Sequence, residues 1–221
     1  MLGVLAYLVR THELLQGVDD AVAPWGVRHA TAFTHEVVAN WTNFGATGGV
    51  VAVLVLVFVC EGVRRPSRWL PLFLVVIGVG QWLVTTEIKA LLDRVRPTVD
   101  AGAAALGPSF PSGHTTGATA CFAAAALVIG RGRSPRAHAL LAGAAAFMAV
   151  SVAASRVLLG VHWLSDVVGG LALGWGWFAL CALAFGGRLL RFGAPVESAE
   201  RALDLEERHE ADHTVGGAQI R

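Results

Sequence analysis

The chain has 221 residues, of which 55% are hydrophobic and 15% are charged, and its mean hydropathy is +0.60. This composition leaves too little polar surface for a water-soluble protein and predicts a polytopic membrane protein. The formal net charge of +1 gives no overall reason to expect a nucleic-acid partner. The three cysteines lie inside apolar runs without metal-ligand or disulfide spacing, so we interpret them as packing residues.

Residues 1–44 are interpreted as a partial span followed by an interfacial segment. Residues 3–9 are apolar but shorter than the about 20 residues of a membrane-crossing helix, so they are a partial sixth span, the tip of a signal segment or an anchor. The apolar residues that follow recur at spacings of three and four: Leu15, Val18, Val22, Trp25, and then Phe33, Val37 and Trp41. This spacing predicts amphipathic helices, which lie either on the outer membrane surface or against the helix bundle.

Five apolar segments of spanning length follow, at residues 45–63, 69–92, 115–129, 140–158 and 163–185. Backbone groups in lipid must be paired within their own segment, so each segment is expected to be a helix. The predicted fold is therefore an all-α transmembrane bundle, with residues 45–192 as its membrane domain. Residues 193–221 are predicted to form a polar cytoplasmic tail, to which we assign no chemistry.

Arginines mark every second connection between the predicted spans. They are Arg64, Arg65 and Arg68 after the first clear span, Arg131, Arg133 and Arg136 after the third, and Arg188 and Arg191 after the fifth. Positive residues concentrate on the cytoplasmic side of membrane proteins. The connections at residues 93–113 and 160–162 are therefore predicted to lie outside the cytoplasm.

Charged and polar residues gather at the predicted outer ends of the spans. Lys89 lies about 30 Å along a helix from Trp69 and so emerges at the outer boundary. Arg96 is seven residues further and shares a face with Lys89 if the helix continues, although Pro97 limits that continuation. Arg156 lies in the same way at the outer end of the predicted span at residues 140–158.

The stretch "PSGH", Pro111 to His114, opens the span between them. Ser112 and Gly113 at a helix start leave backbone N–H groups unpaired, which together with the positive helix end form an anion site, with His114 at its mouth. His162 and Asp166 are four residues apart at the start of the last span, so they share a face and the carboxylate can orient the imidazole.

These residue types together suit phosphoryl chemistry. Fixed cations and backbone amides bind a tetrahedral oxyanion, for which phosphate is the leading candidate. A carboxylate-oriented histidine suits nucleophilic attack, and a second histidine suits protonation of the leaving group. Each feature alone has an ordinary structural explanation as a helix end, a turn or a surface contact. Those explanations do not account for the position of all these residues on the same predicted side of one helix bundle.

With these residues, the sequence resembles the type 2 phosphatidic acid phosphatase (PAP2) family. Three motifs carry the resemblance: "KALLDRVRP" from Lys89 to Pro97, "PSGH" from Pro111 to His114, and "SRVLLGVHWLSD" from Ser155 to Asp166. All three are intact and in order, and the resemblance covers about residues 45–185. It departs from bacterial members, which commonly have six spans, in showing five clear ones.

The resemblance implies a role for each motif residue. Lys89, Arg96 and Arg156 would hold the phosphoryl oxygens, together with Ser112 and the Gly113 amide. His162 would be the nucleophile that forms a phosphohistidine, Asp166 would orient it, and His114 would protonate the leaving oxygen. No metal or cofactor is expected, because the three cations replace the charge that a metal would supply.

The implied activity is hydrolysis of a lipid phosphate or diphosphate, because relatives act on undecaprenyl diphosphate, phosphatidic acid and phosphatidylglycerol phosphate. The motifs do not distinguish among these lipids. Two alternatives stay open: a vanadate-dependent haloperoxidase, which shares the oxyanion motifs but is soluble in its known forms, and a non-catalytic lipid-phosphate binder or transporter on the same scaffold. The lipid bilayer is the other expected partner.

Overall fold

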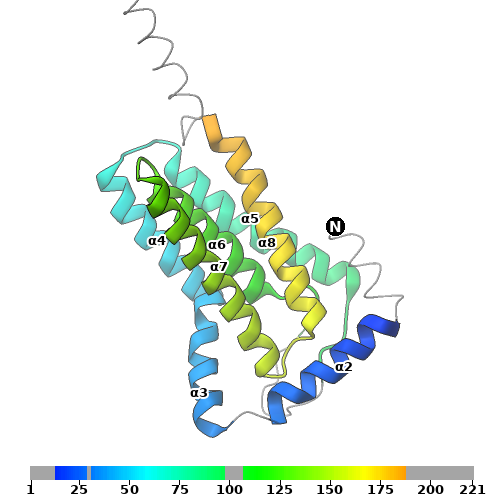
Figure 1. Ribbon diagram of the computed structural model, residues 1–221. Helices are drawn as coiled ribbons and strands as arrows, with labels where there is room; N and C mark the ends of the chain where they lie inside the picture. The colour runs from blue at the N-terminus through cyan, green and yellow to red at the C-terminus, as the bar shows by residue number, and fades with distance from the viewer. Residues whose placement is uncertain (1–12, 29–30, 98–106, 188–221) are drawn as a thin grey trace, which may run out of the picture. The chain divides into compact units, whose positions relative to one another are not determined.

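The computed structural model describes residues 13–28, 31–97 and 107–187, and within these ranges the regular structure is entirely helical (Figure 1). The elements are α2 (Glu13–Arg28), α3 (Ala32–Trp41), the 3₁₀ turn η1 (Thr42–Gly45), α4 (Thr47–Arg64), α5 (Leu70–Leu92), α6 (Gly113–Gly130), α7 (Pro135–Leu158) and α8 (Leu164–Phe185). The predicted all-α class is confirmed.

Five of the described helices are long and apolar enough to cross a membrane, namely α4, α5, α6, α7 and α8. They correspond to the five predicted spans. The short apolar run at residues 3–9 lies outside the described residues, so the sixth span stays a prediction. The chain divides into two units, residues 1–182 and 183–221, and the predicted boundary of the tail at residue 193 also lies outside the described part.

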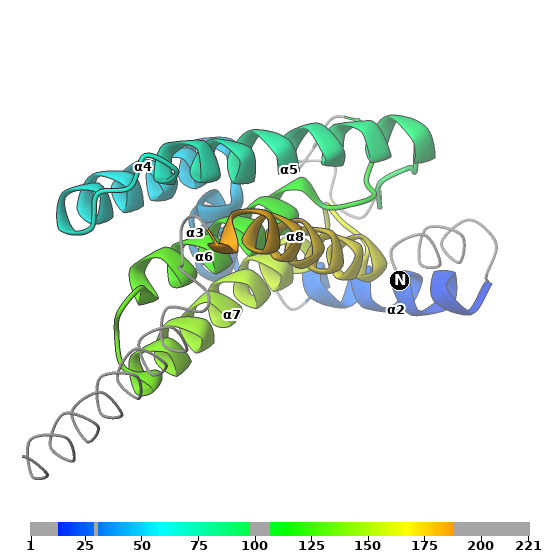
Figure 2. The same ribbon diagram turned by 90° about the horizontal axis from the view of Figure 1, so that it is seen from above.

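Helix α6 is the centre of the bundle. In its most apolar window 67% of the residues are buried, compared with 22–33% in the other four spans. It contacts α4, α5, α7 and η1, and Figure 2 shows it between the α4–α5 pair and α7. Its sequence, GHTTGATACFAAAALVIG, is rich in Gly, Ala and Thr. Small side chains let neighbouring helices approach closely in a membrane, which explains why this segment takes the central place.

Helix α8 packs on α6 through glycines. A Cβ atom added at Gly170 would lie 2.9 Å from the carbonyl oxygen of Ser112 and from Cβ of Thr115. One added at Gly174 would lie 2.6 Å from the carbonyl oxygen of Thr116. Both positions therefore require glycine, and the four-residue spacing places them on one face of α8. This packing brings the first turn of α8 against the first turn of α6.

One helix start differs from the predicted one in an informative way. Helix α7 begins at Pro135 rather than at residue 140, because Ser134 caps it by accepting a hydrogen bond from the Ala137 N–H at 3.3 Å. The polar first turn of α7, with Arg136 and His138, hid this start from a hydropathy argument. Helix α5 ends at Leu92, where Asp93 adopts a left-handed conformation (φ 41°).

The end of α5 answers a question that the sequence left open, whether the helix continues to Arg96. Arg96 does not share a helix face with Lys89, because the chain leaves the helix at Asp93 and residues 93–97 form no helix. A left-handed residue stops the i to i+4 hydrogen-bond pattern, so the chain changes direction there. Arg96 reaches the same end of the bundle from this non-helical segment.

The N-terminal helices pack at the end of the bundle where α7 ends and α8 begins (Figure 1). Both α2 and α3 contact α7. On α2, Asp19 and Ala23 are buried whereas Val18 and Trp25 are exposed. One face of α2 therefore packs against the bundle, which is one of the two interpretations of this amphipathic pattern. The neighbouring face, with Val18 and Trp25, is apolar and exposed.

Candidate active site

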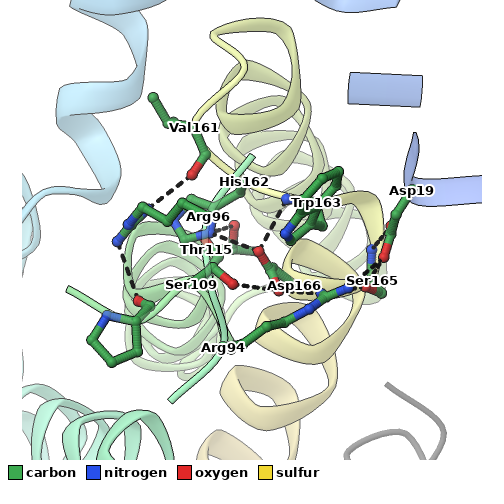
Figure 3. A network of polar contacts seen from close by, with 12 residues as sticks. Asp19, Arg94, Arg96, Ser109, Thr115, Val161, His162, Trp163, Ser165 and Asp166 are labelled. Carbon is green, nitrogen blue, oxygen red and sulfur yellow. Dashed lines mark hydrogen bonds and ion pairs between the residues drawn. The ribbon is translucent and has the colours of Figure 1, made fainter. Parts of the chain in front are cut away.

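The sequence-predicted site residues come together at one end of the bundle, from five different parts of the chain. Lys89 is in the last turn of α5, Arg96 follows that helix, His114 is the second residue of α6, and Arg156 is in the last turn of α7. His162 precedes α8, and Asp166 is in its first turn. The network around the last two residues is drawn in Figure 3.

His162 and Asp166 form a buried pair. Nδ1 of His162 lies 3.2 Å from Oδ2 of Asp166, and the two residues are 2% and 0% exposed. The same carboxylate oxygen accepts a hydrogen bond from the Trp163 backbone N–H at 3.0 Å. This second bond satisfies an N–H group at the start of α8 and holds the carboxylate in place.

Arg96 determines which tautomer of His162 is present. Its Nη1 lies 3.1 Å from His162 Nε2, and a guanidinium can only donate hydrogen bonds, so Nε2 is the acceptor. The proton of the neutral ring is therefore on Nδ1, which donates it to Asp166. Burial lowers the pKa of His162 to about 4, although the hydrogen bond and charge of Asp166 act in the opposite direction. The imidazole is neutral at pH 7, with a lone pair on Nε2.

Arg96 is held in this position by three carbonyl groups. Its Nε donates to Gly107 at 2.9 Å, Nη1 donates to Val161 at 2.8 Å, and Nη2 donates to Pro108 at 3.3 Å. Burial lowers the pKa of Arg96, and the charge of Asp166 opposes that shift. A guanidinium fixed by carbonyls on three sides is a pre-positioned charge for an anion.

Lys89 lies beside the first turn of α6. Its ammonium group donates a hydrogen bond to the carbonyl oxygen of Pro108, and a Cβ added at Gly113 would lie 4.0 Å from Lys89 Cε. Ser112 is fully buried at the N-cap position of α6, where its side chain makes no capping hydrogen bond and its Oγ accepts one from Thr115 Oγ1 at 3.1 Å. The Ser112 N–H donates to the Asp166 carbonyl oxygen at 3.0 Å, which ties this turn directly to α8. It is therefore not one of the unpaired N–H groups that the sequence predicted at this helix start.

Arg156 is a buried cation on the α7 side of the site. It is 8% exposed, and its Nη1 donates a hydrogen bond to Thr42 Oγ1 of η1 at 3.2 Å. Its Nε is buried without a hydrogen-bond partner among the described residues. A buried donor of this kind is costly to leave unpaired, so Arg156 has hydrogen-bonding capacity left for a ligand. Sequence reasoning did not find Thr42, which carries no motif signal.

His114 completes the group. It lies close enough to His162, Arg96, Arg156 and Lys89 for their charges to act on it. Its carbonyl oxygen would be 2.6 Å from a Cβ added at Gly45, so η1 packs directly against this turn of α6. The close packing fixes where the first turn of α6 sits relative to the site.

Sequence reasoning missed four residues around Asp166, one of which, Ser109, donates from Oγ to Asp166 Oδ1 at 3.4 Å. Arg94 Nη1 donates to Asp166 Oδ1 at 2.6 Å and to Ser165 Oγ at 2.7 Å, and Arg94 Nη2 donates to Asp19 Oδ2 at 2.8 Å (Figure 3). Arg94 lies inside the spacer of the first motif, two residues before Arg96, and that proximity was the available signal. Asp19 is on α2 beside another aspartate, and no sequence pattern distinguishes the two.

The arrangement places a neutral imidazole, whose Nε2 accepts a hydrogen bond from Arg96, among three cations at a helix start. These groups together can bind a tetrahedral anion and present a nucleophilic nitrogen to its central atom. Across residues 13–28, 31–97 and 107–187, no three His, Cys, Asp or Glu side chains are placed to share one metal ion.

Comparison with known proteins gives matches over this region. Residues 69–189 match the model of the PAP2 superfamily. The chain is 28% identical over 176 residues to phosphatidylglycerophosphatase B of Bacillus subtilis, covering 77% of this chain and 84% of that one. It is 30% identical over 184 residues to a lipid A 1-phosphatase of Rhizobium etli, covering 72% and 74%.

A mycobacterial protein and a solved structure are also similar. Decaprenylphosphoryl-5-phosphoribose phosphatase of Mycobacterium tuberculosis is 37% identical over 118 residues, which are 50% of this chain and 58% of that one. The crystal structure of a transmembrane PAP2-type phosphatidylglycerolphosphate phosphatase from Bacillus subtilis superposes with a TM-score of 0.78 at 28% identity. The superposition covers 86% of this chain and 94% of that one.

Proposed function

Because the chain belongs to the PAP2 superfamily and is a membrane-embedded phosphatase, we propose that it hydrolyses a lipid phosphate or diphosphate through a phosphohistidine on His162. The observation that carries this proposal is the geometry of His162, whose Nδ1 faces Asp166 and whose Nε2 faces Arg96. This geometry leaves a lone pair directed at the cation cluster. An anionic phosphoryl group bound by those cations would meet it.

In the first proposed step, the phosphoryl group binds to Lys89, Arg96 and Arg156, with Ser112 and the Gly113 amide completing the anion site. Arg96 exchanges its hydrogen bond to Nε2 for one to a phosphoryl oxygen. Nε2 then attacks phosphorus and the bond from phosphorus to the lipid oxygen breaks. His114, which takes up a proton when the anionic phosphoryl group binds beside it, gives that proton to the lipid oxygen. Asp166 stabilises the positive charge that grows on His162.

In the second proposed step, neutral His114 takes a proton from a water molecule. The resulting hydroxide attacks phosphorus, the bond from phosphorus to Nε2 breaks, and phosphate leaves. The His162 ring and His114 return to their starting states. The three cations stabilise both transition states by position and charge, so the scheme requires no metal ion.

The substrate class is proposed from the relatives and from the site. The matched proteins are named for phosphatidylglycerophosphate, lipid A and decaprenylphosphoryl-phosphoribose, which are all lipids that carry a phosphate. The motif residues contact the phosphate only, so candidate substrates are phosphatidylglycerol phosphate, phosphatidic acid and undecaprenyl diphosphate. The proposed partners are this lipid and the bilayer, and we expect no nucleic-acid partner.

We propose that the site faces the extracytoplasmic side. The connections with Arg65 and Arg131 approach one another, since Arg131 Nη2 donates to the Arg65 carbonyl oxygen at 3.4 Å. These arginine-rich connections join the opposite ends of α4, α5, α6 and α7 from the site. Arginine-rich connections favour the cytoplasm, so the other end of the bundle, with His162, is assigned to the outside.

The test is phosphate release from the full chain in mixed micelles, with phosphatidylglycerol phosphate, phosphatidic acid and undecaprenyl diphosphate as substrates. We expect release from at least one lipid, loss of release in His162→Ala, and wild-type release in His138→Ala. His138 is the matched control, because it lies in the first turn of α7 and hydrogen-bonds to the Ser134 carbonyl group. Lipid binding without phosphate release would favour a non-catalytic binder instead.

A further inference from the structure

We propose that Asp19 on α2 is a positioning residue for catalysis, which holds Arg94 and through Arg94 sets the orientation and charge of Asp166 behind His162. The proposal rests on the proposed function, in which His162 is the nucleophile. Asp19 lies outside residues 69–189, the part that matches the superfamily model. The N-terminal helix α2 thereby becomes part of the catalytic apparatus.

Asp19 is buried and fully paired. It is 1% exposed, and a buried carboxylate requires partners for both oxygens. Oδ1 accepts a hydrogen bond from the Ser165 backbone N–H at 2.9 Å. Oδ2 accepts hydrogen bonds from Ser165 Oγ and, at 2.8 Å, from Arg94 Nη2. These contacts tie α2 to the first turn of α8, which also carries Asp166.

Arg94 connects the two carboxylates. One guanidinium nitrogen, Nη1, donates to Asp166 Oδ1 at 2.6 Å, and the other, Nη2, donates to Asp19 Oδ2 at 2.8 Å (Figure 3). The guanidinium also lies over the Trp163 ring, 5.6 Å from its centroid. Because the guanidinium is planar and rigid, fixing one of its nitrogens on Asp19 fixes the direction of the other toward Asp166.

Asp166 uses its two oxygens for different purposes. Oδ1 faces Arg94, and Oδ2 faces Nδ1 of His162. If Arg94 had Asp166 as its only counter-ion, its whole charge would act on Asp166 and weaken the stabilisation of the positive charge that grows on His162. Asp19 shares the charge of Arg94. Two carboxylates around one guanidinium carry a net negative charge, which stabilises the positive charge that grows on His162.

The contacts of Asp19 separate this role from substrate binding. Among the described residues, Asp19 makes hydrogen bonds and ion pairs with Arg94 and Ser165, and with none of Lys89, Arg96 and Arg156. Loss of its charge should therefore slow the chemical step and leave the binding of the phosphoryl group largely unchanged.

The experiment compares Asp19→Asn with Asp19→Glu and with Asp20→Asn, in the full chain and in micelles of the lipid phosphate that the wild-type protein hydrolyses fastest. The single-turnover rate constant is measured with enzyme in saturating excess, because it does not depend on the fraction of enzyme that is folded. We expect about a 10-fold fall in Asp19→Asn with KM within about 2-fold of wild type. This is far less than the about 10⁴-fold loss for a directly orienting carboxylate, because Asp166 itself remains.

Asp19→Glu keeps the charge and should recover at least half of the loss on a logarithmic scale. Asp20→Asn changes the exposed neighbour and should behave as wild type. A purely structural role for Asp19 would lower the yield of folded enzyme and leave the rate constant unchanged, and that result would overturn the proposal. If Asp19→Asn does not fold, Arg94→Lys keeps the charge but lacks the planar fork that bridges Asp19 and Asp166, and a wild-type rate constant in that variant would also overturn the proposal.

His162→Ala is measured in parallel to separate the two proposals. If it retains wild-type turnover, the phosphohistidine mechanism is wrong, whatever the Asp19 variants do. If it is inactive while Asp19→Asn keeps the wild-type rate constant, the proposed function stands and the role of Asp19 is rejected.

Discussion

Arg96 Nη1 lies 3.1 Å from His162 Nε2, the atom that attacks phosphorus in the proposed mechanism. A guanidinium donor at this position assigns the lone pair of the neutral imidazole to Nε2. The same contact occupies that lone pair while no anion is bound. A phosphoryl group that draws Arg96 to its own oxygen would release the nucleophile as it binds, which couples binding to activation.

The first prediction concerns Arg96. Arg96→Ala should lower kcat about 10²- to 10³-fold, the usual loss for one preorganised charge at a transition state, and should also raise KM. Arg96→Lys should recover only part of the rate, because an ammonium group lacks the planar fork of guanidinium. Steady-state kinetics on micellar substrate measure both. Arg133→Ala is the control, since Arg133 is exposed and hydrogen-bonds to the Ile129 carbonyl group at the opposite end of α6. A loss below 3-fold in Arg96→Ala would contradict the assignment.

The second prediction concerns acid stability. The pKa of His162 is about 4 in the folded protein because of burial, compared with an ordinary value of 6.5. Above pH 6.5 the ring is neutral in both folded and unfolded chains and contributes no pH dependence. Between pH 6.5 and 4 the unfolded chain binds a proton that the folded chain does not, so stability falls as the pH falls, by about 3 kcal/mol in total. His162→Gln should lack this part of the decline, as measured by thermal unfolding in detergent across the same pH range. Parallel declines in both proteins would show that His162 is not the group responsible.

The third prediction concerns the contact between α6 and α8. Gly170→Ala places a methyl group 2.9 Å from the Ser112 carbonyl oxygen, so α8 must shift, at a cost of about 1–3 kcal/mol, and activity should fall. Gly176→Ala is the matched change in the same helix, where nothing lies within 4 Å of the added Cβ. That substitution should be neutral or stabilising by up to about 1 kcal/mol, because alanine is the better helix former. Thermal unfolding of both variants is the measurement, and equal unfolding temperatures would disprove the close packing.

The fourth prediction concerns orientation in the membrane. In a background with Cys60→Ser, Ala104→Cys in the connection at residues 93–113 should react with an impermeant thiol reagent in intact cells. Arg133→Cys, in the arginine-rich connection, should react only after the membrane is permeabilised. Replacement of Cys60 is needed because it is an exposed cysteine, whereas Cys121 and Cys181 are buried. The reverse labelling pattern would place the site in the cytoplasm.

The fifth prediction concerns metal ions and vanadate. Activity should persist in excess EDTA, because Lys89, Arg96 and Arg156 neutralise the phosphoryl charge in the proposed mechanism. Vanadate should inhibit, since it adopts the five-coordinate geometry of in-line attack at phosphorus. Phosphate release in EDTA, followed by a vanadate titration, tests both statements. Activity that EDTA abolishes and Mg²⁺ restores would require a metal-assisted mechanism instead.

The membrane class, the five spans and the motif residues of the candidate site could be predicted from the sequence alone. An apolar run long enough to cross the bilayer must form a helix in lipid, because its backbone groups have to be paired within the segment. Leu70–Leu92 and the other four spans are therefore predictable from local composition. The His162–Asp166 pair was also predictable, because residues four apart in one chain segment are neighbours by local geometry. These features depend on residues that are close together in the sequence.

The residues that contact Asp166 from the side opposite His162 could not be predicted from the sequence. Arg94 and Asp166 are 72 residues apart in the chain, and Asp19 and Ser165 are 146 apart, so no local spacing relates them. The glycines of α8 let its first turn approach α6, and the packing of α2 then brings Asp19 to Arg94. A buried carboxylate on an amphipathic helix has the same sequence signature as an exposed one. Its partners are set by which helices pack together, which is a property of the whole bundle.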